Sequence, residues 1–214
     1  MSDSAKAKTF DTHPDNPALA ESPFVLSYKH VGRPESRLPA GVTLHERPML
    51  GHLVLRGGAI ALDGALRNAI NLSLPGEPLT MTQDSSGNYS AQWLSPDEWL
   101  LIVPPGEEFA VENKLREALG DAHYAITNVS GGQTLLELTG KDVRNLLMKS
   151  VIYDVDDKSF PVGKGVITVF AKTTVNIRRP AADVWQLVVR RSFADYSYRW
   201  LLDAGREYHI AVNV

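Results

Sequence analysis

Apolar residues recur at two spacings in the chain after residue 50, and the two spacings alternate along it. Short apolar or alternating runs predict strands over 52–58, 79–83, 89–95, 98–104, 123–130, 132–140, 165–170, 173–179 and 184–191. Apolar residues three and four apart predict helices over 59–72, 107–120, 141–151 and 193–205. This order of elements is typical of an α+β fold with antiparallel sheets.

Two of the predicted helices carry clear local signals. In the helix over 141–151, we expect the buried side to consist of Val143, Leu146, Leu147 and Ser150. The helix over 193–205 follows Ser192, and Asp195 stands three residues later, which is the spacing of a capping box. Gly205 is expected to end this helix.

The chain after residue 50 contains a short internal repeat. DEWLLIV at residues 97–103 matches DVWQLVV at residues 183–189, and each run precedes a predicted helix. Upstream, Arg-Asn pairs stand on the helices over 59–72 and 141–151. Each half therefore reads as a ferredoxin-like unit of strand, helix, hairpin and helix. We expect both helices of a unit to cover one face of its antiparallel sheet, and the two units to be related by a pseudo-twofold axis.

The first 50 residues lack such a pattern. Six of the 13 prolines of the chain fall there, namely Pro14, Pro17, Pro23, Pro34, Pro39 and Pro48. Phe10, Phe24 and Leu44 are isolated apolar residues without a period. Because proline disfavours helix at its own and the preceding position, residues 1–50 are predicted to form an extended arm before one domain over 51–214. Either the arm lies along a partner surface, or it is a disordered tail.

Composition narrows the class of protein. The chain has 214 residues, of which 43% are hydrophobic and 22% charged, which is typical of a folded globular protein. A net charge of -3 and a pI near 6.1 argue against a nucleic-acid partner. The sequence has no cysteine, no signal-peptide pattern and no apolar run near the ~20 residues that span a bilayer. We therefore expect a cytoplasmic protein with no membrane role.

No motif predicts a catalytic, cofactor-binding or metal-binding residue. The six histidines are scattered, without the i, i+4 spacing of a helical metal site: His13, His30, His45, His52, His123 and His209. Glycines cluster at residues 56–64 and 129–132 without GxGxxG spacing, and Gly140 and Gly163 precede lysine without the rest of a Walker loop. We interpret these glycines as tight turns.

Arginine and aromatic residues gather late in the chain. The arginines are Arg178, Arg179, Arg190, Arg191 and Arg199, and the aromatic residues are Tyr196, Tyr198 and Trp200. Strand geometry points neighbouring arginines to opposite faces, so only part of this set can share a surface. Three interpretations stay open: solvated strand ends, a protein contact, or pairing with an anionic ligand such as folate.

Four segments resemble the gamma subunit of heterotetrameric sarcosine oxidase. They are WLSPDEWLLIVP, NVSGGQTLLELTGKDVRNLLMKS, FPVGKG and VVRRSFADYSYRWLLDAG, within a match from about residue 51 to the end. More remotely, residues 138–150 and the RSFADYSYRWL segment resemble the folate-binding domain of the glycine-cleavage T-protein family. The resemblance implies a T-protein-like α+β fold.

The resemblance also implies a function. Members belong to a complex that oxidatively demethylates sarcosine to glycine, forming 5,10-methylenetetrahydrofolate and hydrogen peroxide. It implies alpha, beta and delta partner subunits, with FAD, FMN, NAD and the folate site on the two larger subunits and zinc in the smallest. The gamma chain is then a non-catalytic structural and assembly subunit, without a cofactor of its own.

Two alternatives remain at this point. One is a free-standing folate-binding protein of the T-protein class, in which an arginine near the last strand and helix holds the folate glutamate tail. The other is a small structural adaptor with no enzyme attached.

Overall fold

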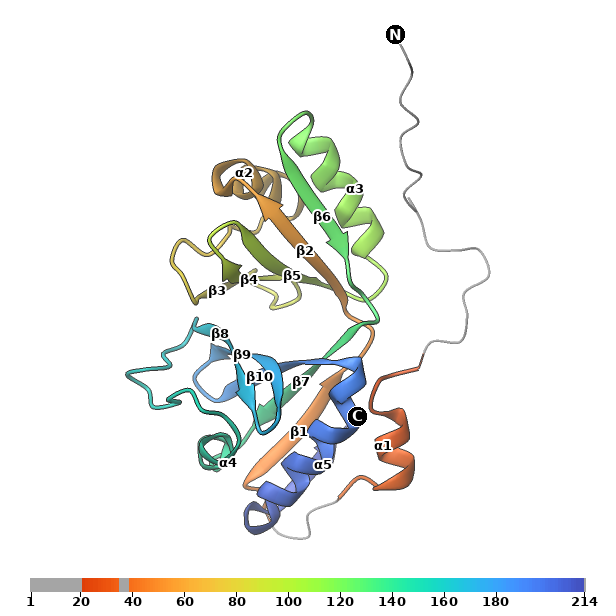
Figure 1. The fold of residues 1–214 in the computed structure, drawn as a ribbon, viewed down its shortest axis with the longest axis vertical. Helices are drawn as coiled ribbons and strands as arrows, with labels where there is room; N and C mark the ends of the chain where they lie inside the picture. Colours follow the sequence, from red (N-terminus) through yellow and green to blue (C-terminus); the bar gives the residue numbers. More distant parts are fainter. Residues whose placement is uncertain (1–20, 35–38, 214) are drawn as a thin grey trace.

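The computed structural model describes residues 21–34 and 39–213. Its strands form two sheets, sheet A with six strands and sheet B with five. Figure 1 shows the two sheets facing each other in the middle of the molecule, with helices on their outer sides. The α+β architecture with mainly antiparallel sheets, predicted from the apolar spacing, is confirmed.

Sheet B comes from the first half of the domain and has the strand order β3-β4-β5-β2-β6, with every neighbouring pair antiparallel. Its strands are β2 (Gly51–Gly57), β3 (Met81–Gln83), β4 (Ser90–Ser95), β5 (Glu98–Val103) and β6 (Tyr124–Asn128). Helices α2 (Ala59–Ile70) and α3 (Glu108–Leu119) cover its outer face. Leu62 of α2 and Leu115 of α3 pack with Leu53 and Leu101 of the sheet, and all four are fully buried.

Sheet A has the order β11-β1-β7-β10-β9-β8 and is antiparallel except for the parallel pair β1 and β11. Its strands are β1 (Val42–Arg47), β7 (Gln133–Thr139), β8 (Gly165–Phe170), β9 (Thr173–Ala181), β10 (Val184–Arg190) and β11 (Ile210–Asn213). Helices α4 (Val143–Ser150) and α5 (Ala194–Ala204) cover its outer face, and α1 (Val25–His30) contacts α5. Short 3-10 turns flank α5 at Arg191–Phe193 and Arg206–Tyr208.

The two sheets repeat one topology. The order β4-β5-β2 in sheet B matches β9-β10-β7 in sheet A, and in each half one helix precedes the hairpin and another follows it. The matching segments DEWLLIV and DVWQLVV form β5 and β10, which occupy equivalent places. The predicted duplication is thus confirmed at the level of topology. The halves differ in that β1 lies between β7 and β11, whereas β6 pairs directly with β2.

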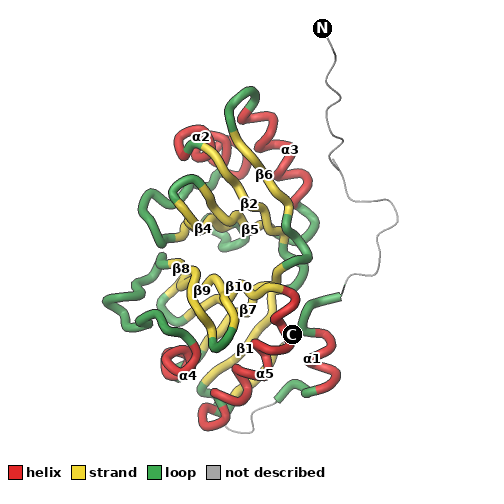
Figure 2. The backbone as a smooth tube through the Cα atoms, viewed as in Figure 1, coloured by secondary structure: helices red, strands yellow, loops and turns green. Residues whose placement is uncertain are grey.

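Two connecting segments join the sheets on one side of the molecule. Strand β1 leads into β2 through residues 48–50, and β6 leads into β7 through residues 129–132. Because β2 pairs with β6 and β1 pairs with β7, the two connections run side by side from one sheet to the other (Figure 2). Met49 has a φ of 61° in the first connection. On the β3 side, an isolated bridge between Thr80 and Lys164 links the sheets again.

The inner faces of the two sheets pack against each other through a small apolar cluster. Its buried members are Leu50, Leu100, Ile102, Leu135 and Val188. Beside it, a Cβ at Gly165 of sheet A would lie 3.0 Å from the Gln92 Cδ of sheet B. The Gln92 side chain thus packs directly on the Gly165 backbone and leaves little room for a larger residue at this position.

The predicted arm over residues 1–50 needs a correction in its described part. Phe24 and Leu44 are fully buried in the core of sheet A, and β1 lies inside that sheet between β7 and β11. The segment VTLHER alternates buried and half-buried residues, which is the ordinary period of a strand. Residues 1–20 and 35–38 lie outside the described residues, so the arm stays a prediction for residues 1–20.

Of the two helix features predicted from the sequence, one is confirmed and the other is wrong. The predicted buried side of α4 is confirmed, since Val143, Leu146, Leu147 and Ser150 are its buried residues. The capping box at Ser192 is wrong. Phe193 precedes α5 without a side-chain cap, and the Asp195 carboxylate instead accepts hydrogen bonds from Ser27 Oγ at 2.9 Å and Arg199 Nε at 2.8 Å. A tertiary contact with α1 replaces the local one.

Candidate functional site

The late arginines and aromatic residues do not form one site. Arg178 lies between the two sheets with only 3% of its surface exposed. Its Nε donates to Gln186 Oε1 at 2.7 Å, and its Nη1 donates to Ser90 Oγ at 3.0 Å. Burial lowers the pKa of Arg178 to about 10, and the nearby positive charge of Arg47 acts in the same direction. This arginine is part of the packing between the sheets.

Arg179 points to the other side of sheet A, as strand geometry predicts, and it is also buried. It donates from Nη2 to the Ala182 carbonyl at 2.8 Å, and from Nη1 to the Phe160 carbonyl at 2.9 Å and to Asp157 Oδ1 at 2.5 Å. Its guanidinium lies 5.1 Å from the ring centroid of Trp185. These contacts use its donors within the chain and fix the segment around Asp157.

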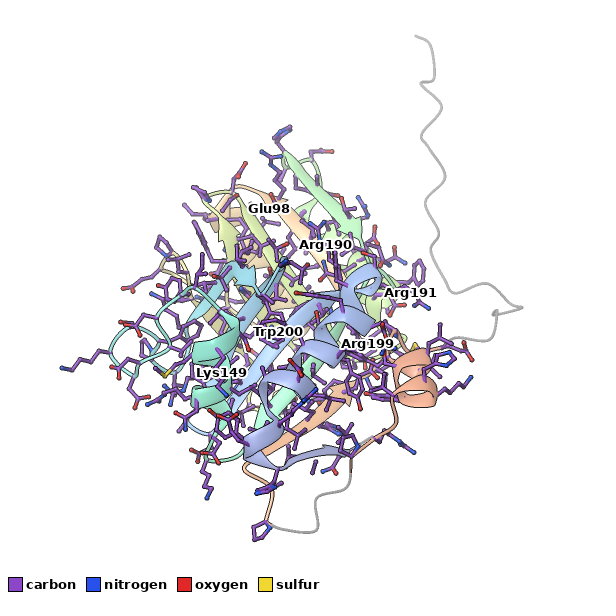
Figure 3. The ribbon with its side chains drawn as sticks, turned by 60° about the horizontal axis from the view of Figure 1, so that its bottom comes forward. Glu98, Lys149, Arg190, Arg191, Arg199 and Trp200 are labelled. Carbon is purple, nitrogen blue, oxygen red and sulfur yellow. The ribbon has the colours of Figure 1, made fainter. Side chains whose placement is uncertain are left out.

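The other three arginines are exposed, and Arg199 on α5 lies apart from the neighbouring pair Arg190 and Arg191 (Figure 3). Arg190 lines a cavity of about 240 Å³ between the sheets, together with Glu98 and Gln133. Arg191 donates to the Glu21 carbonyl at 3.4 Å, and Arg199 pairs with Asp195 within α5. Each therefore faces a different surrounding, and the five arginines share no surface.

The aromatic residues of this group are fixed by contacts within the domain. Tyr198 is fully buried and donates to the Gly32 carbonyl at 2.7 Å, while Trp200 Nε1 donates to Ser150 Oγ at 3.1 Å between α5 and α4. The Tyr196 hydroxyl accepts the Lys172 N–H at 3.2 Å. None of the three interpretations of the cluster includes these contacts, which hold the aromatic side chains within the domain.

His52 is buried, and the sequence did not predict this burial. It lies in β2, and its Nδ1 is 2.9 Å from the Leu50 carbonyl, which can only accept, so Nδ1 carries the proton. Nε2 has no partner among the described residues. Burial lowers the pKa of His52 to about 4, and the charge of Arg178 adds to this effect. The imidazole is therefore neutral at pH 7.

The remaining histidines do not converge. His13 lies outside the described residues, and within residues 21–34 and 39–213 no three His, Asp or Glu side chains gather as metal ligands. Residues 129–132 form the turn that joins β6 to β7, with Gly131 at a φ of 81°. In the cluster at residues 56–64, Gly57 ends β2, Gly58 precedes α2 and Gly64 lies inside α2. A Cβ at Gly140 would collide with the Gly41 carbonyl, and Gly163 has a φ of 86°. The interpretation as tight turns is confirmed for residues 129–132 and Gly163 but is wrong for Gly64, which lies inside a helix.

Some buried polar side chains of the described residues bond to each other across the domain. Glu46 is an example, since it is 2% exposed and accepts hydrogen bonds from Ser22 Oγ at 2.5 Å and Thr134 Oγ1 at 2.8 Å. Such an arrangement holds the N-terminal segment on sheet A. Of the helices in the described part of the chain, none has the length and apolar character needed to cross a bilayer.

Comparison with known proteins identifies relatives along most of the chain. The sarcosine oxidase gamma subunit family model matches residues 56–207. The sarcosine oxidase subunit gamma of Corynebacterium sp. (strain U-96) is 30% identical over 203 residues, covering 94% of this chain and 97% of that protein. The subunit gamma of Corynebacterium sp. (strain P-1) is 33% identical over 144 residues, covering 67% of this chain and 70% of that protein.

Solved structures agree with these relatives. A chain of the heterotetrameric sarcosine oxidase from Corynebacterium sp. U-96, in complex with pyrrole 2-carboxylate, superposes with a TM-score of 0.77 at 27% identity, covering 92% of this chain and all of that one. The glycine cleavage system aminomethyltransferase T from Bartonella henselae has a TM-score of 0.66 at 12% identity, covering 91% of this chain and 59% of that one, and so shares the fold. The T-protein-like fold is therefore confirmed. The chain belongs to the sarcosine oxidase gamma subunit family.

Proposed function

We propose that this chain is a non-catalytic structural and assembly subunit of a cytoplasmic heterotetrameric sarcosine oxidase. In that complex, sarcosine is oxidatively demethylated to glycine, with formation of 5,10-methylenetetrahydrofolate and hydrogen peroxide. The observation that carries the proposal is the match to a gamma subunit over 94% of this chain and 97% of that protein. A match over nearly both full lengths supports the same role in an assembly.

The distribution of polar groups supports a non-catalytic role. A reaction centre needs a nucleophile, an acid or a base in reach of a shared reacting atom. The arginines that the sequence singled out instead bond within the fold, as Arg178 does with Gln186 and Arg179 with Ala182. We therefore expect no catalytic, cofactor-binding or metal-binding residue in this chain, and this expectation stays a prediction.

The cofactors and partners of the complex follow from the same proposal. We expect alpha, beta and delta subunits as partners, with FAD, FMN, NAD and the tetrahydrofolate site on the two larger subunits and zinc in the smallest. We also expect residues 1–20 to lie along a partner. Because β1 belongs to sheet A, the deletion that tests this last point should end at residue 20.

The alternative of a free-standing folate-binding protein has less support. Such a site would pair an arginine near the last strand and helix with the folate glutamate tail. Arg190 and Arg191 are exposed there but face different surroundings, and Arg199 is held by Asp195. Titration of the isolated chain with tetrahydrofolate separates the two functions, since binding in the micromolar range would favour the alternative.

Assembly tests the proposal. All four subunits are co-expressed with an affinity tag on the alpha subunit, with and without this chain, and the purified material is analysed by mass. We expect the full set to yield a complex that contains this chain in stoichiometric amount, and lower recovery of complex when the chain is omitted. Purification of the other subunits with this chain absent from the eluate, although it is expressed and folded, would overturn the proposal.

A further inference from the structure

Strand β8 (Gly165–Phe170) is the last strand of sheet A, next to β9 (Figure 1). Main-chain hydrogen bonds close its two ends on the side away from β9. The Gly165 N–H donates to the Leu79 carbonyl at 3.0 Å, and the Ala171 N–H donates to the Ser150 carbonyl at 2.7 Å. Because every second residue of an antiparallel strand directs its main-chain groups to the same side, the N–H and C=O of Ile167 also point away from β9.

The middle of this edge is open. None of the described residues bonds to the outward N–H and C=O of Ile167. When water is displaced from the edge, a donor and an acceptor with the spacing of a sheet are satisfied together by the main chain of another extended segment. The chemistry of the edge therefore specifies a strand as its occupant.

The other sheet edges in the described part of the chain are covered or short. On β6, the Ile126 carbonyl accepts from Arg116 Nη2 of α3 at 3.2 Å, and on β11 the Val212 N–H donates to the Pro34 carbonyl at 3.1 Å. Strand β3 has only three residues. Proteins usually protect an apolar edge, because it can pair with another chain. An open edge at β8, in a chain whose relatives are subunits, indicates a surface for strand pairing.

Exposed apolar side chains lie along the same edge. Ile167 has 53% and Val169 has 37% of its surface exposed, and Ile167 lines the cavity of about 240 Å³ between the sheets, beside Leu94. Alternation along the strand places Val169 on the same face as Ile167. Near the two closed ends, Ile152 is 80% exposed and Val162 is 52% exposed. A strand added to β8 would cover Ile167 and Val169 with its own side chains.

Two lysines flank β8. Lys164 precedes the strand and Lys172 follows it, and no ion pair of the described residues includes either of them. A matching strand would therefore carry acidic side chains near its ends. A second copy of this chain matches less well. Antiparallel pairing of Ile167 with Val169 of the copy would set Lys164 opposite Lys172 twice, and like charges in opposite positions are destabilising.

We propose that β8 receives an extended, mainly apolar strand of another subunit of the complex, which pairs with the main chain of Ile167 and packs on Ile167 and Val169. Acidic side chains of this strand would lie near Lys164 and Lys172. The inference rests on the proposed function, which supplies the partners. Residues 1–20 and a second copy of this chain are the competing occupants, and the experiment separates them.

Hydrogen–deuterium exchange of the complete complex and of the full chain alone, resolved to single residues, tests the inference. We expect the Ile167 amide to exchange about tenfold or more slowly in the complex, because a new main-chain bond protects it. The Thr168 amide points to β9 in both samples and is the internal control. Equally fast exchange of Ile167 in both samples would overturn the inference.

Slow exchange of Ile167 in the chain alone would also overturn it, because the occupant would then be this chain itself. Protection that rises with protein concentration would identify a second copy as the occupant. Protection that is independent of concentration and is lost when residues 1–20 are deleted would identify that segment.

Two variants at one position separate main-chain pairing from side-chain contact. Ile167→Pro removes the outward N–H but no bond to β9, and an edge strand tolerates proline at such a position. We expect this variant to lower recovery of the complex about tenfold or more, through loss of main-chain bonds. Ile167→Thr is the matched control, since threonine keeps the N–H and suits a strand, and its recovery should stay within about threefold of the wild type.

Urea unfolding of the two variants checks that both remain folded, and the exchange experiment on the wild type needs no variant. Wild-type recovery with Ile167→Pro, or equal losses with both variants, would overturn the inference. Failure of the wild-type chain to join the complex would overturn the proposed function and the inference with it, whereas an unprotected Ile167 in an assembled complex would overturn the inference alone.

Discussion

Arg178 Nη1 donates a hydrogen bond to Ser90 Oγ at 3.0 Å, and this contact ties β9 of sheet A to β4 of sheet B. The same guanidinium is held by Gln186, whose Nε2 donates to Glu137 Oε2 at 3.0 Å. A chain of four polar side chains thus crosses the interface between the sheets. Because burial makes unpaired polar groups costly, removing its central member affects all the others.

Replacing Arg178 with methionine should destabilise the protein. The variant Arg178→Met leaves Ser90 Oγ and Gln186 Oε1 without the donor that they share and removes the positive charge near Glu137, a loss of about 3 kcal/mol. Urea unfolding measures the free energy. Arg190→Met on the same sheet is the control, since Arg190 is exposed, and it should stay near the wild type. Equal stability of the two variants would contradict the structural role of Arg178.

Stability should depend on pH through His52. Its pKa is about 4 in the folded chain, below the ordinary value of 6.5, so between these values the unfolded chain binds more protons. The contribution of His52 to the free energy of unfolding is therefore complete above pH 6.5. It decreases as the pH falls toward 4, by about 3 kcal/mol in total. Urea unfolding at a series of pH values measures this slope.

The matched variant for this prediction is His52→Asn. Its side-chain amide can still donate to the Leu50 carbonyl but does not titrate in this range. We expect the free energy of unfolding of this variant to change less between pH 4 and 6.5 than that of the wild type, even if the variant is less stable throughout. An unchanged slope would show that other groups cause the acid sensitivity.

The N-terminal segment should contribute to the core. Phe24 is fully buried, with its ring centroid 5.9 Å from that of Tyr198, so Phe24→Ala should cost about 3 to 4 kcal/mol. Leu26→Ala in α1, which begins directly after Phe24, removes a side chain that is 57% exposed and should cost little. Thermal or urea unfolding compares them. Similar stabilities would argue that residues 21–34 are not part of the folded core.

The start of α5 should be insensitive to Ser192. Since no side-chain cap forms there, Ser192→Ala should change the free energy of unfolding by less than about 0.5 kcal/mol. Asp195→Ala should cost about 1 kcal/mol or more, because the bonds to Ser27 and Arg199 are lost. A loss of about 1 kcal/mol in Ser192→Ala would instead support the predicted capping box.

The sequence predicts the elements whose signals are local. The apolar faces of α2 to α5 and the hairpin of β4 and β5 follow from spacing, and the similarity of DEWLLIV to DVWQLVV indicates two equivalent strands. The alternating pattern of VTLHER, which forms β1, is a local signal of a strand too. The prolines around it, Pro39 and Pro48, led to the interpretation of an arm, although both stand outside the strand itself.

Features that depend on distant contacts were not predictable in this way. Strand β1 is stabilised by β7, about 90 residues later, and by the parallel strand β11 near the end of the chain. Ser90 and Arg178 are 88 residues apart, and neither side chain indicates its partner. That Trp99 Nε1 is buried without a partner among the described residues is likewise a property of its surroundings.

The most direct test of the account is an assay of this chain purified without its partners. Sarcosine oxidation, measured as hydrogen peroxide formation, and flavin content, measured by absorbance, are recorded beside the complete complex at equal concentration. We predict no turnover and no bound flavin in the isolated chain, and both in the complex. Turnover of sarcosine or stoichiometric flavin in the isolated chain would contradict the assignment of this protein as a non-catalytic subunit.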